Sequence, residues 1–159
     1  MSVRYNYQIL NAAQISGFTA TEGLPNPAVG ALIADLRHDQ RDSPLYPHQG
    51  YKVFSNLESA TRYLGGDVNY ERTEIFTSYH QPLGGGRWLH FGLSHGAAIP
   101  LGSSSNTLAL TRLFFPGGQN SIRGYQEGRA SPRDDQGRFV GAESYLLRSV
   151  EFEQALTPK

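Results

Sequence analysis

Hydrophobic and polar residues alternate with a period of two along much of this chain. The first run covers 3–9, where Val3, Tyr5, Tyr7 and Ile9 alternate with polar residues. Successive side chains of a β-strand point to opposite faces, so this pattern predicts a strand with one apolar and one polar face. Gly and Pro residues then end the pattern between 19 and 27, which indicates a loop.

Five further strands are predicted by the same alternation. They cover 28–41, 51–64, 68–80, 88–99 and 143–154. A turn at 42–47 and glycine-rich hairpins at 65–67 and 84–86 separate the first four of them. No segment has a convincing helical periodicity, so we expect an all-β protein.

Three positions depart from simple alternation. The apolar residues change face between Tyr70 and Ile75, and a β-bulge near 71–74 would explain the change. Trp88 stands at the start of a strand, where a membrane-spanning strand places an aromatic ring at the bilayer interface. Arg148 falls on the apolar face of the last strand, so we expect either a bulge there or an interfacial position for this side chain.

The predicted architecture is an antiparallel meander of six strands, with short turns at one end and longer loops at the other. Strands of about ten residues suit a tilted crossing of a bilayer. A soluble β-sandwich shows the same alternation and is the alternative. The polar faces of two strands carry charges of both signs, as the wall of a water-filled lumen does. These residues are Asp35, Arg37, Asp39 and Arg41, followed by Lys52, Asn56, Glu58 and Arg62. We therefore predict an antiparallel transmembrane β-barrel.

Composition narrows the possible functions. Lys and Arg together number 14, as do Asp and Glu, so no general field attracts nucleic acid or anionic lipid. The chain has no cysteine, which excludes disulfides and thiolate chemistry. It also has no run of about 18 apolar residues, which excludes a spanning helix. The first residues lack the apolar core of a signal peptide, so we expect the chain to have been cut from a longer envelope protein.

The segment 113–125 reads Leu-Phe-Phe-Pro-Gly-Gly-Gln-Asn-Ser-Ile-Arg-Gly-Tyr. Its Gly and Pro residues exclude a helix or a central strand, while its aromatic residues indicate an ordered loop that folds onto another part of the protein. From Phe115 to Tyr125 the segment resembles the loop-six signature of BamA- and TamA-type outer-membrane barrels, also called the bacterial surface antigen family. A second stretch, 39–50, is similar to a turn that joins two barrel strands in that family.

In that family loop six folds back into the barrel, and its Arg-Gly-aromatic tip docks on the wall of the lumen. The resemblance therefore implies that this loop locks the barrel interior. The residues that match the motif are Gly117, Gly118, Ser121, Ile122, Arg123, Gly124 and Tyr125.

A carboxylate of the last strand is the expected partner of Arg123. Val150-Glu-Phe152 resembles the family's Leu-Glu-Phe, whose Glu receives the loop arginine. Alternation also points Glu151 and Glu153 away from the apolar face, into the lumen. Glu151 is the first choice and Glu153 the fallback, and the resemblance implies the family's Asp on the following strand as a second partner. We expect the pair to be buried, because a guanidinium inside a protein needs a carboxylate of matching geometry.

The resemblance covers 28–158 and corresponds to the middle of the family's sixteen-stranded barrel. It implies that 1–159 form a partial β-barrel domain, with loop six at about 100–141. Three family features have no counterpart in this sequence: the POTRA domains that precede the barrel, the later strands with their Asp-x-Gly, and the aromatic C-terminus.

The function implied by the resemblance is the assembly and insertion of β-barrel proteins in the bacterial outer membrane, without a cofactor or a covalent intermediate. The partners would be the lipid bilayer, nascent β-barrel proteins and periplasmic accessory proteins. Relatives that secrete one dedicated protein share the loop, so a two-partner-type secretion barrel is one alternative. A soluble β-sandwich binding module and an enzyme fused to such a barrel are the others.

One stretch, 92–96, matches the G-x-S-x-G nucleophile elbow of hydrolases. That elbow requires a helix directly after the serine, and Pro100 and Gly102 exclude one here. The hydrolase order also needs a histidine well downstream of Ser94, and none follows His95. We therefore expect no catalytic residue in this chain.

Other patterns also lack a functional signature. His38, Asp39 and His48 do not have the recurrent spacing of metal ligands, so we expect no metal site. Gly117 and Gly118 are not followed by the Lys of a phosphate-binding loop. Arginines and aspartates alternate between 129 and 138, which favours a solvated loop over a partner-binding site.

Overall fold

The computed structural model describes residues 1–9, 28–102, 112–119 and 121–156. The strands are β1 (Ser2–Ile9), β2 (Ala28–Asp39), β3 (Gly50–Ala60), β4 (Tyr70–Pro82), β5 (Arg87–Pro100) and β6 (Ser144–Gln154). They form one antiparallel sheet in the order β1-β2-β3-β4-β5-β6, so each strand pairs with its neighbour in sequence. The predicted all-β meander of six strands is confirmed.

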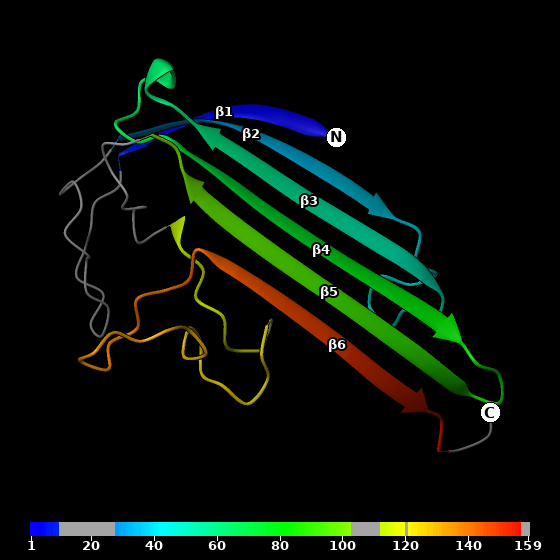
Figure 1. The fold of residues 1–159 in the computed structure, drawn as a ribbon. Helices are drawn as coiled ribbons and strands as arrows, with labels where there is room; N and C mark the ends of the chain where they lie inside the picture. The colour runs from blue at the N-terminus through cyan, green and yellow to red at the C-terminus, as the bar shows by residue number, and fades with distance from the viewer. Residues whose placement is uncertain (10–27, 103–111, 120, 157–159) are drawn as a thin grey trace.

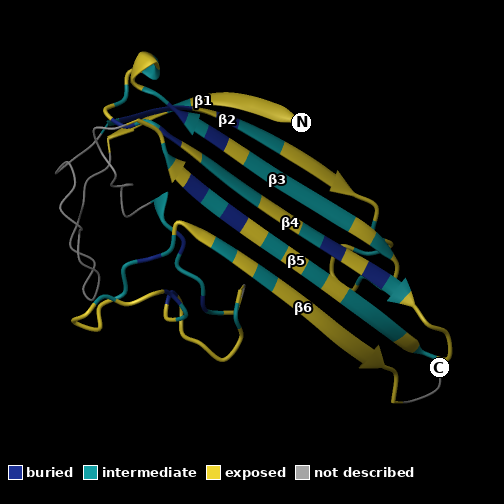
Figure 2. Cartoon of the chain, in the orientation of Figure 1, coloured by how far each residue is buried: buried dark blue, intermediate teal, exposed yellow. Residues whose placement is uncertain are grey.

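The sheet is open, with β1 and β6 as its two edges (Figure 1). The turns after β2 (40–49) and β4 (83–86) lie at one end, and the connections after β3 (61–69) and β5 (101–143) lie at the other. Figure 2 shows that the edge strands are mostly exposed, whereas buried residues gather in the central strands and near the loop end. In the part of the chain that the structure describes, no helix is long and apolar enough to span a membrane.

One face of the sheet, here called the outer face, is apolar across neighbouring strands. Tyr79 lies opposite Phe91, and Phe91 lies opposite Val150. The large side chains of this face remain exposed. They include Leu32, Leu36, Tyr51, Leu57, Ile75, Tyr79, Phe91, Leu93, Ile99, Leu146, Val150 and Phe152. Apolar exposure on this scale suits contact with lipid.

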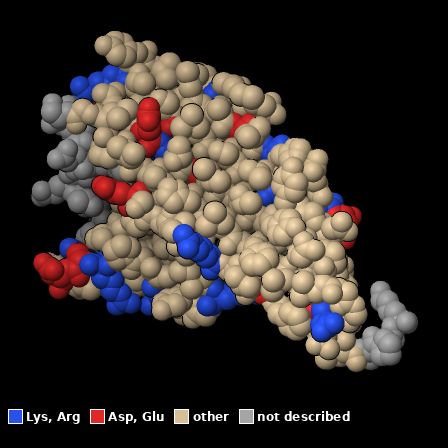
Figure 3. Space-filling view, turned by 45° about the vertical axis from the view of Figure 1, so that its right-hand side comes forward, with Lys and Arg blue, Asp and Glu red and all other residues tan. Residues whose placement is uncertain are grey.

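The opposite face, here called the inner face, carries the charges. Asp35 accepts a hydrogen bond from the Asn56 side chain of β3 (2.8 Å) and pairs with Arg4 of β1. Further along, Arg72 and Glu74 of β4 form an ion pair of 2.9 Å. Charges of both signs also intersperse over the molecular surface in Figure 3. Polar pairs of mixed charge on one face of a sheet are typical of a water-facing barrel wall.

A small hydrophobic core lies at the loop end of the sheet. Its members, from four strands and from the β3–β4 and β5–β6 connections, are Val29, Ala31, Ala60, Val68, Tyr70, Ala98 and Phe114. Most of the strand members are small, so the backbone of the connections can approach the sheet closely. The fold therefore places its tightest packing where the β5–β6 loop meets the inner face.

The β-bulge predicted near 71–74 is wrong. Residues of β4 keep an unbroken register with both β3 and β5 through this stretch. Tyr70 departs from the apolar pattern because its side chain belongs to the inner face, where its hydroxyl donates a 2.6 Å hydrogen bond to Glu58. An apolar ring buried on the polar face looks, in the sequence, like a change of parity.

The expectation for Trp88 also needs correction. Trp88 lies on the inner face and stacks on His48, with ring centroids 4.3 Å apart, so it is not an outward interfacial ring. β5 and β6 pair without a bulge, which leaves Arg148 on the outer face opposite Leu93. Of the two expectations for Arg148, the bulge is therefore excluded and the interfacial position stays a prediction. The tight hairpin predicted at 65–67 is in fact a longer connection, because β3 ends at Ala60 and a 3-10 turn, η1 (Arg62–Leu64), follows.

In the β2–β3 turn, side-chain oxygens accept hydrogen bonds from backbone N–H groups that lie outside the strands. Asp42 accepts from the backbone N–H groups of Ser43, His48 and Gln49 at 2.9–3.1 Å. These three donors, of which the Gln49 N–H contributes most, hold the pKa of Asp42 below its usual value.

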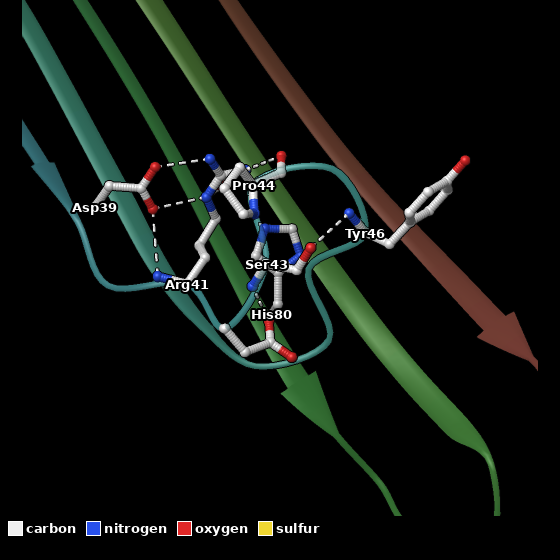
Figure 4. A network of polar contacts seen from close by, with 8 residues as sticks. Asp39, Arg41, Ser43, Pro44, Tyr46 and His80 are labelled. Atoms are coloured by element: carbon white, nitrogen blue, oxygen red, sulfur yellow. Dashed lines mark hydrogen bonds and ion pairs between the residues drawn. The ribbon is translucent and has the colours of Figure 1, made fainter.

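In the same turn, the Arg41 guanidinium donates two hydrogen bonds to the Asp39 carboxylate (Nη2–Oδ2 2.7 Å, Nε–Oδ1 2.8 Å), as Figure 4 shows. The turn then reaches over the inner face until His48 contacts β5 and β6.

Candidate functional site

The β5–β6 connection runs beside β6 (Figure 1), and its root packs on the inner face of the sheet through Phe114. Phe114 and Ala142 join its two ends, because each backbone N–H donates to the other residue's carbonyl at 2.8 Å. The backbone carbonyl of Glu143 then accepts a hydrogen bond from the Ala98 N–H of β5 (2.7 Å), which fixes the start of β6 against the sheet. The segment from 115 to 141 is therefore a closed loop held at one root.

Backbone packing explains the glycine at the entry to this loop. A Cβ at Gly117 would lie 3.0 Å from the Arg129 nitrogen and closer still to the Gln126 carbonyl, and its φ of 132° disfavours other residues. Ser121 closes the same turn: its hydroxyl accepts from the Gly117 N–H and donates to the Gly117 carbonyl, both at 2.7 Å. The Pro-Gly-Gly and Ser positions of the motif thus form one compact turn.

The Ile-Arg-Gly-Tyr tip continues from that turn. Tyr125 donates its N–H to the Ile122 carbonyl (3.3 Å), while its own carbonyl accepts from the Gly118 N–H (3.0 Å). Gly124 has open space around it, so its φ of 94° rather than crowding requires a glycine there. Tyr125 is more than half exposed.

Arg123 and Glu151 are brought together across the loop and β6. The distance from Nη1 to Oε1 is 3.4 Å. The expected burial of this pair is not observed, because the two side chains are 78% and 54% exposed. Both lie on the uncovered inner face of an open sheet, near its β6 edge, so water reaches them. An exposed pair of this kind contributes at most about 1 kcal/mol to stability.

Glu153, the second-choice partner, contacts histidines instead. Its two carboxylate oxygens lie 3.1 Å from His90 Nε2 and 3.6 Å from His48 Nε2. His80 continues this group, with its Nδ1 2.8 Å from that of His90. Within the described ranges, no three such side chains are arranged to hold a metal ion. His38 and Asp39 point to opposite faces of β2, so they cannot converge on one ion.

Ser94 lies in the middle of β5, far from any strand-to-helix turn. Its hydroxyl hydrogen-bonds that of Tyr145 on the neighbouring strand (3.0 Å). His95 lies on the outer face, opposite Leu146, and so points away from Ser94. This geometry gives the serine a structural cross-strand contact, and it prevents the adjacent His95 from acting as its base.

The arginines at 129–138 fold within the loop. Arg138 pairs with Asp134 (2.7 Å) across a small turn, and Arg133 lies over the ring of Phe139 at 4.4 Å. Hydrogen bonds to Asp134, first from the Arg138 backbone N–H and then from its side chain, hold the pKa of this carboxyl below its usual value. These contacts organise the loop itself rather than presenting a free basic patch.

Sequence reasoning missed the root of the loop. Arg112, which directly precedes the motif segment, hydrogen-bonds Tyr70 of β4 at 2.7 Å and pairs with Glu58 of β3 at 3.3 Å. Phe114 is only 5% exposed and packs edge-on against Tyr145. One signal was present: Glu58 and Tyr70 are a carboxylate and a phenol close to the loop ends of adjacent predicted strands. No local pattern connects either of them to Arg112.

Comparison with known proteins identifies a family and several relatives. A model of the Omp85 superfamily domain matches residues 5–158. The outer membrane protein assembly factor BamA of Nitratidesulfovibrio vulgaris is 30% identical over 138 residues, which cover 81% of this chain and 17% of that protein. The sorting and assembly machinery component 50 homolog of Mus musculus is 29% identical over 131 residues, covering 80% and 27%.

A SAM50-like protein of Schizosaccharomyces pombe is 26% identical over 121 residues, which cover 76% of this chain and 25% of that protein. This chain therefore spans about a quarter or less of the length of these relatives. The match to the family model, at residues 5–158, includes strands β2 to β6 and the loop.

Proposed function

Because this chain belongs to the Omp85 superfamily, we propose that it forms part of the barrel wall of an outer-membrane factor that assembles or inserts other β-barrel proteins. The names of two relatives, an outer membrane protein assembly factor and a sorting and assembly machinery component, support this proposal. So does the division of the sheet into an apolar outer face and a charged inner face.

The observation that carries the proposal is the placement of the Ile-Arg-Gly-Tyr loop on the inner face, with Arg123 3.4 Å from Glu151. In a closed barrel this face lines the lumen, so the loop links its own root to β6 through the interior. We propose that this link holds the wall in the geometry that admits a substrate strand. No covalent chemistry is needed, because the work consists of lowering the barrier to strand insertion.

We place the protein in a bacterial outer membrane, where nascent β-barrel proteins and periplasmic accessory proteins would be its partners. Two of the relatives come from a mouse and a yeast, so the outer membrane of a eukaryotic organelle is the alternative. A secretion barrel is the second candidate function, since an inner-face loop is compatible with a channel. The soluble sandwich is disfavoured, because the described strands form one sheet with no second sheet packed on it.

The experiment is a reconstitution in lipid vesicles of the protein expressed from its complete reading frame. An unfolded outer-membrane β-barrel is added, and its folding is followed by the shift of the folded form in gel electrophoresis. We expect folding to be faster than in empty vesicles and to slow when Arg123 is replaced by Ala. Vesicles that leave folding unaccelerated but export a secreted partner would favour the secretion barrel.

A further inference from the structure

The strongest attachment of the loop to the sheet lies at its root and not at the Arg-Gly-Tyr tip. Side-chain exposure separates the two: the Arg112–Glu58 pair is 16% and 6% exposed, against 78% and 54% for Arg123–Glu151. Charge pairs withdrawn from water depend on each other far more than exposed pairs do. Removing one partner should therefore destabilise the protein more at the Arg112–Glu58 pair than at the Arg123–Glu151 pair.

We propose that Arg112 and Phe114 form a clamp that fixes the root of the loop on the inner face and thereby positions Arg123 to reach Glu151. The effect of this clamp on barrel assembly rests on the proposed function. The clamp itself is inferred from the contacts of the two side chains alone. We call the set Glu58, Tyr70, Arg112 and Phe114 the root clamp.

The polar half of the root clamp is a closed triad. The Tyr70 hydroxyl donates to Glu58 (2.6 Å) and accepts from Arg112 Nε (2.7 Å), while Arg112 Nη2 lies 3.3 Å from the same Glu58 oxygen. Arg112 Nη2 also donates to Gln8 of the edge strand β1 (3.1 Å). One guanidinium thus ties the loop to β1, β3 and β4.

Arg72 of β4 does not take the place of Arg112 beside Glu58. It lies directly opposite Glu58 in the strand register, but its side chain contacts other groups. Its Nη1 pairs with Glu74 (2.9 Å), and its guanidinium lies 4.5 Å over the ring of Phe114. Removing Arg112 therefore leaves a carboxylate that is almost fully buried without its closest cation, which is costly.

The apolar half of the root clamp reaches the remaining strands. The Phe114 ring packs on Gly96 of β5 and edge-on against Tyr145 of β6, with centroids 4.9 Å apart. Arg72 joins the two halves, because its Nε donates to the Arg112 carbonyl at 3.3 Å. The clamp therefore contacts β1, β3, β4, β5 and β6, and it holds the loop at its root.

The test is hydrogen–deuterium exchange of the full-length protein in vesicles. The reporters are the backbone amides of Phe114 and Ala142, whose mutual hydrogen bonds close the loop root. We expect Arg112→Gln to raise their exchange by about tenfold or more, since exchange follows the population of the open root. Arg123→Gln is the matched control: it frees the tip and should leave both reporters within about twofold of the parent protein.

A double variant guards against simple misfolding. Glu58→Gln combined with Arg112→Gln removes both charges, so its reporters should exchange more slowly than those of Arg112→Gln alone. Amides in the middle of β4 and β5 should stay protected in every variant. The proposal would be overturned if the reporters exchanged equally fast in Arg112→Gln and in the parent protein. It would also be overturned if Arg123→Gln raised their exchange as much as Arg112→Gln does. These outcomes do not depend on assembly activity, so the clamp can fail while the proposed function holds, or the reverse.

Discussion

The ring of Phe114 occupies the space that a side chain at position 96 would need. A Cβ built on Gly96 would lie 2.8 Å from two atoms of that ring and would also collide with Tyr145. The glycine of β5 and the aromatic residue of the loop are thus complementary in shape, although 18 positions separate them in the sequence. Docking of the loop depends on this close approach.

Gly96→Ala should therefore displace Phe114 and destabilise the folded protein by about 1–3 kcal/mol, the usual cost of overpacking. The measurement is the thermal unfolding midpoint of the full-length protein in detergent. Gly92→Ala is the control on the same strand, because its Cβ would meet only the hydroxyl of Ser149, which can rotate away. Equal midpoints for Gly96→Ala and the parent protein would show that the loop does not dock as described.

Arg123→Ala and Glu151→Ala should each lower assembly of substrate barrels, with the double variant little worse than either single one. Both changes break the same contact, whose loss should cost at most about 1 kcal/mol of stability because the pair is exposed. Folding of an added β-barrel substrate measures the activity, and thermal unfolding measures the stability. Glu153→Ala, which touches His48 and His90 instead, is the control; two single variants with full activity would contradict the prediction.

The β2–β3 turn should lose protection at acidic pH. Its Asp42 has a pKa below the usual 3.8 in the folded protein, so its contribution to stability is fully present above pH 3.8. That contribution disappears as the pH falls through the lowered folded pKa. Hydrogen exchange at the amides of His48 and Gln49 measures the effect, and in Asp42→Asn this pH dependence should vanish. If the pH profile of exchange is the same in Asp42→Asn and the parent protein, the Asp42 carboxylate is not the group that makes the turn pH-dependent.

Ser94→Ala should leave assembly intact. The change removes one hydrogen bond to Tyr145, which costs about 0.5–1.5 kcal/mol of stability. Assembly of a substrate barrel and turnover of an ester substrate are measured side by side. Esterase turnover that is present in the parent protein and lost in Ser94→Ala would revive a hydrolase function.

The chain of 159 residues, expressed alone, should not be a stable soluble monomer. Its two edge strands are unpaired, and its outer face exposes a continuous row of large apolar residues, a combination that favours aggregation. Size-exclusion chromatography in buffer without detergent tests this expectation. A monodisperse monomer that melts cooperatively would favour the soluble sandwich over the membrane wall.

Alternation was a sufficient guide wherever one face of a strand is apolar and the other polar. It assigned Val150 and Phe152 to one face and Glu151 and Glu153 to the other. The register of β5 and β6 agrees with this division, because it sets the first pair opposite Phe91 and Leu89. It failed at Tyr70 and Trp88, because both rings lie on the polar face under connections that fold over it. A period of two cannot distinguish an aromatic ring that meets lipid from one covered by a loop.

What the sequence by itself determined is therefore the local part: six strands, their order and their two faces, because side-chain direction in a strand follows from position alone. The glycine-rich motif also indicated an ordered loop. Only the tertiary structure decided where that loop is held. Arg112 meets Glu58 and Tyr70 across 54 and 42 positions of chain, and Phe114 needs the bare backbone of Gly96. Such contacts depend on the register of separate strands and on the path of the connection, and no short stretch of sequence encodes either.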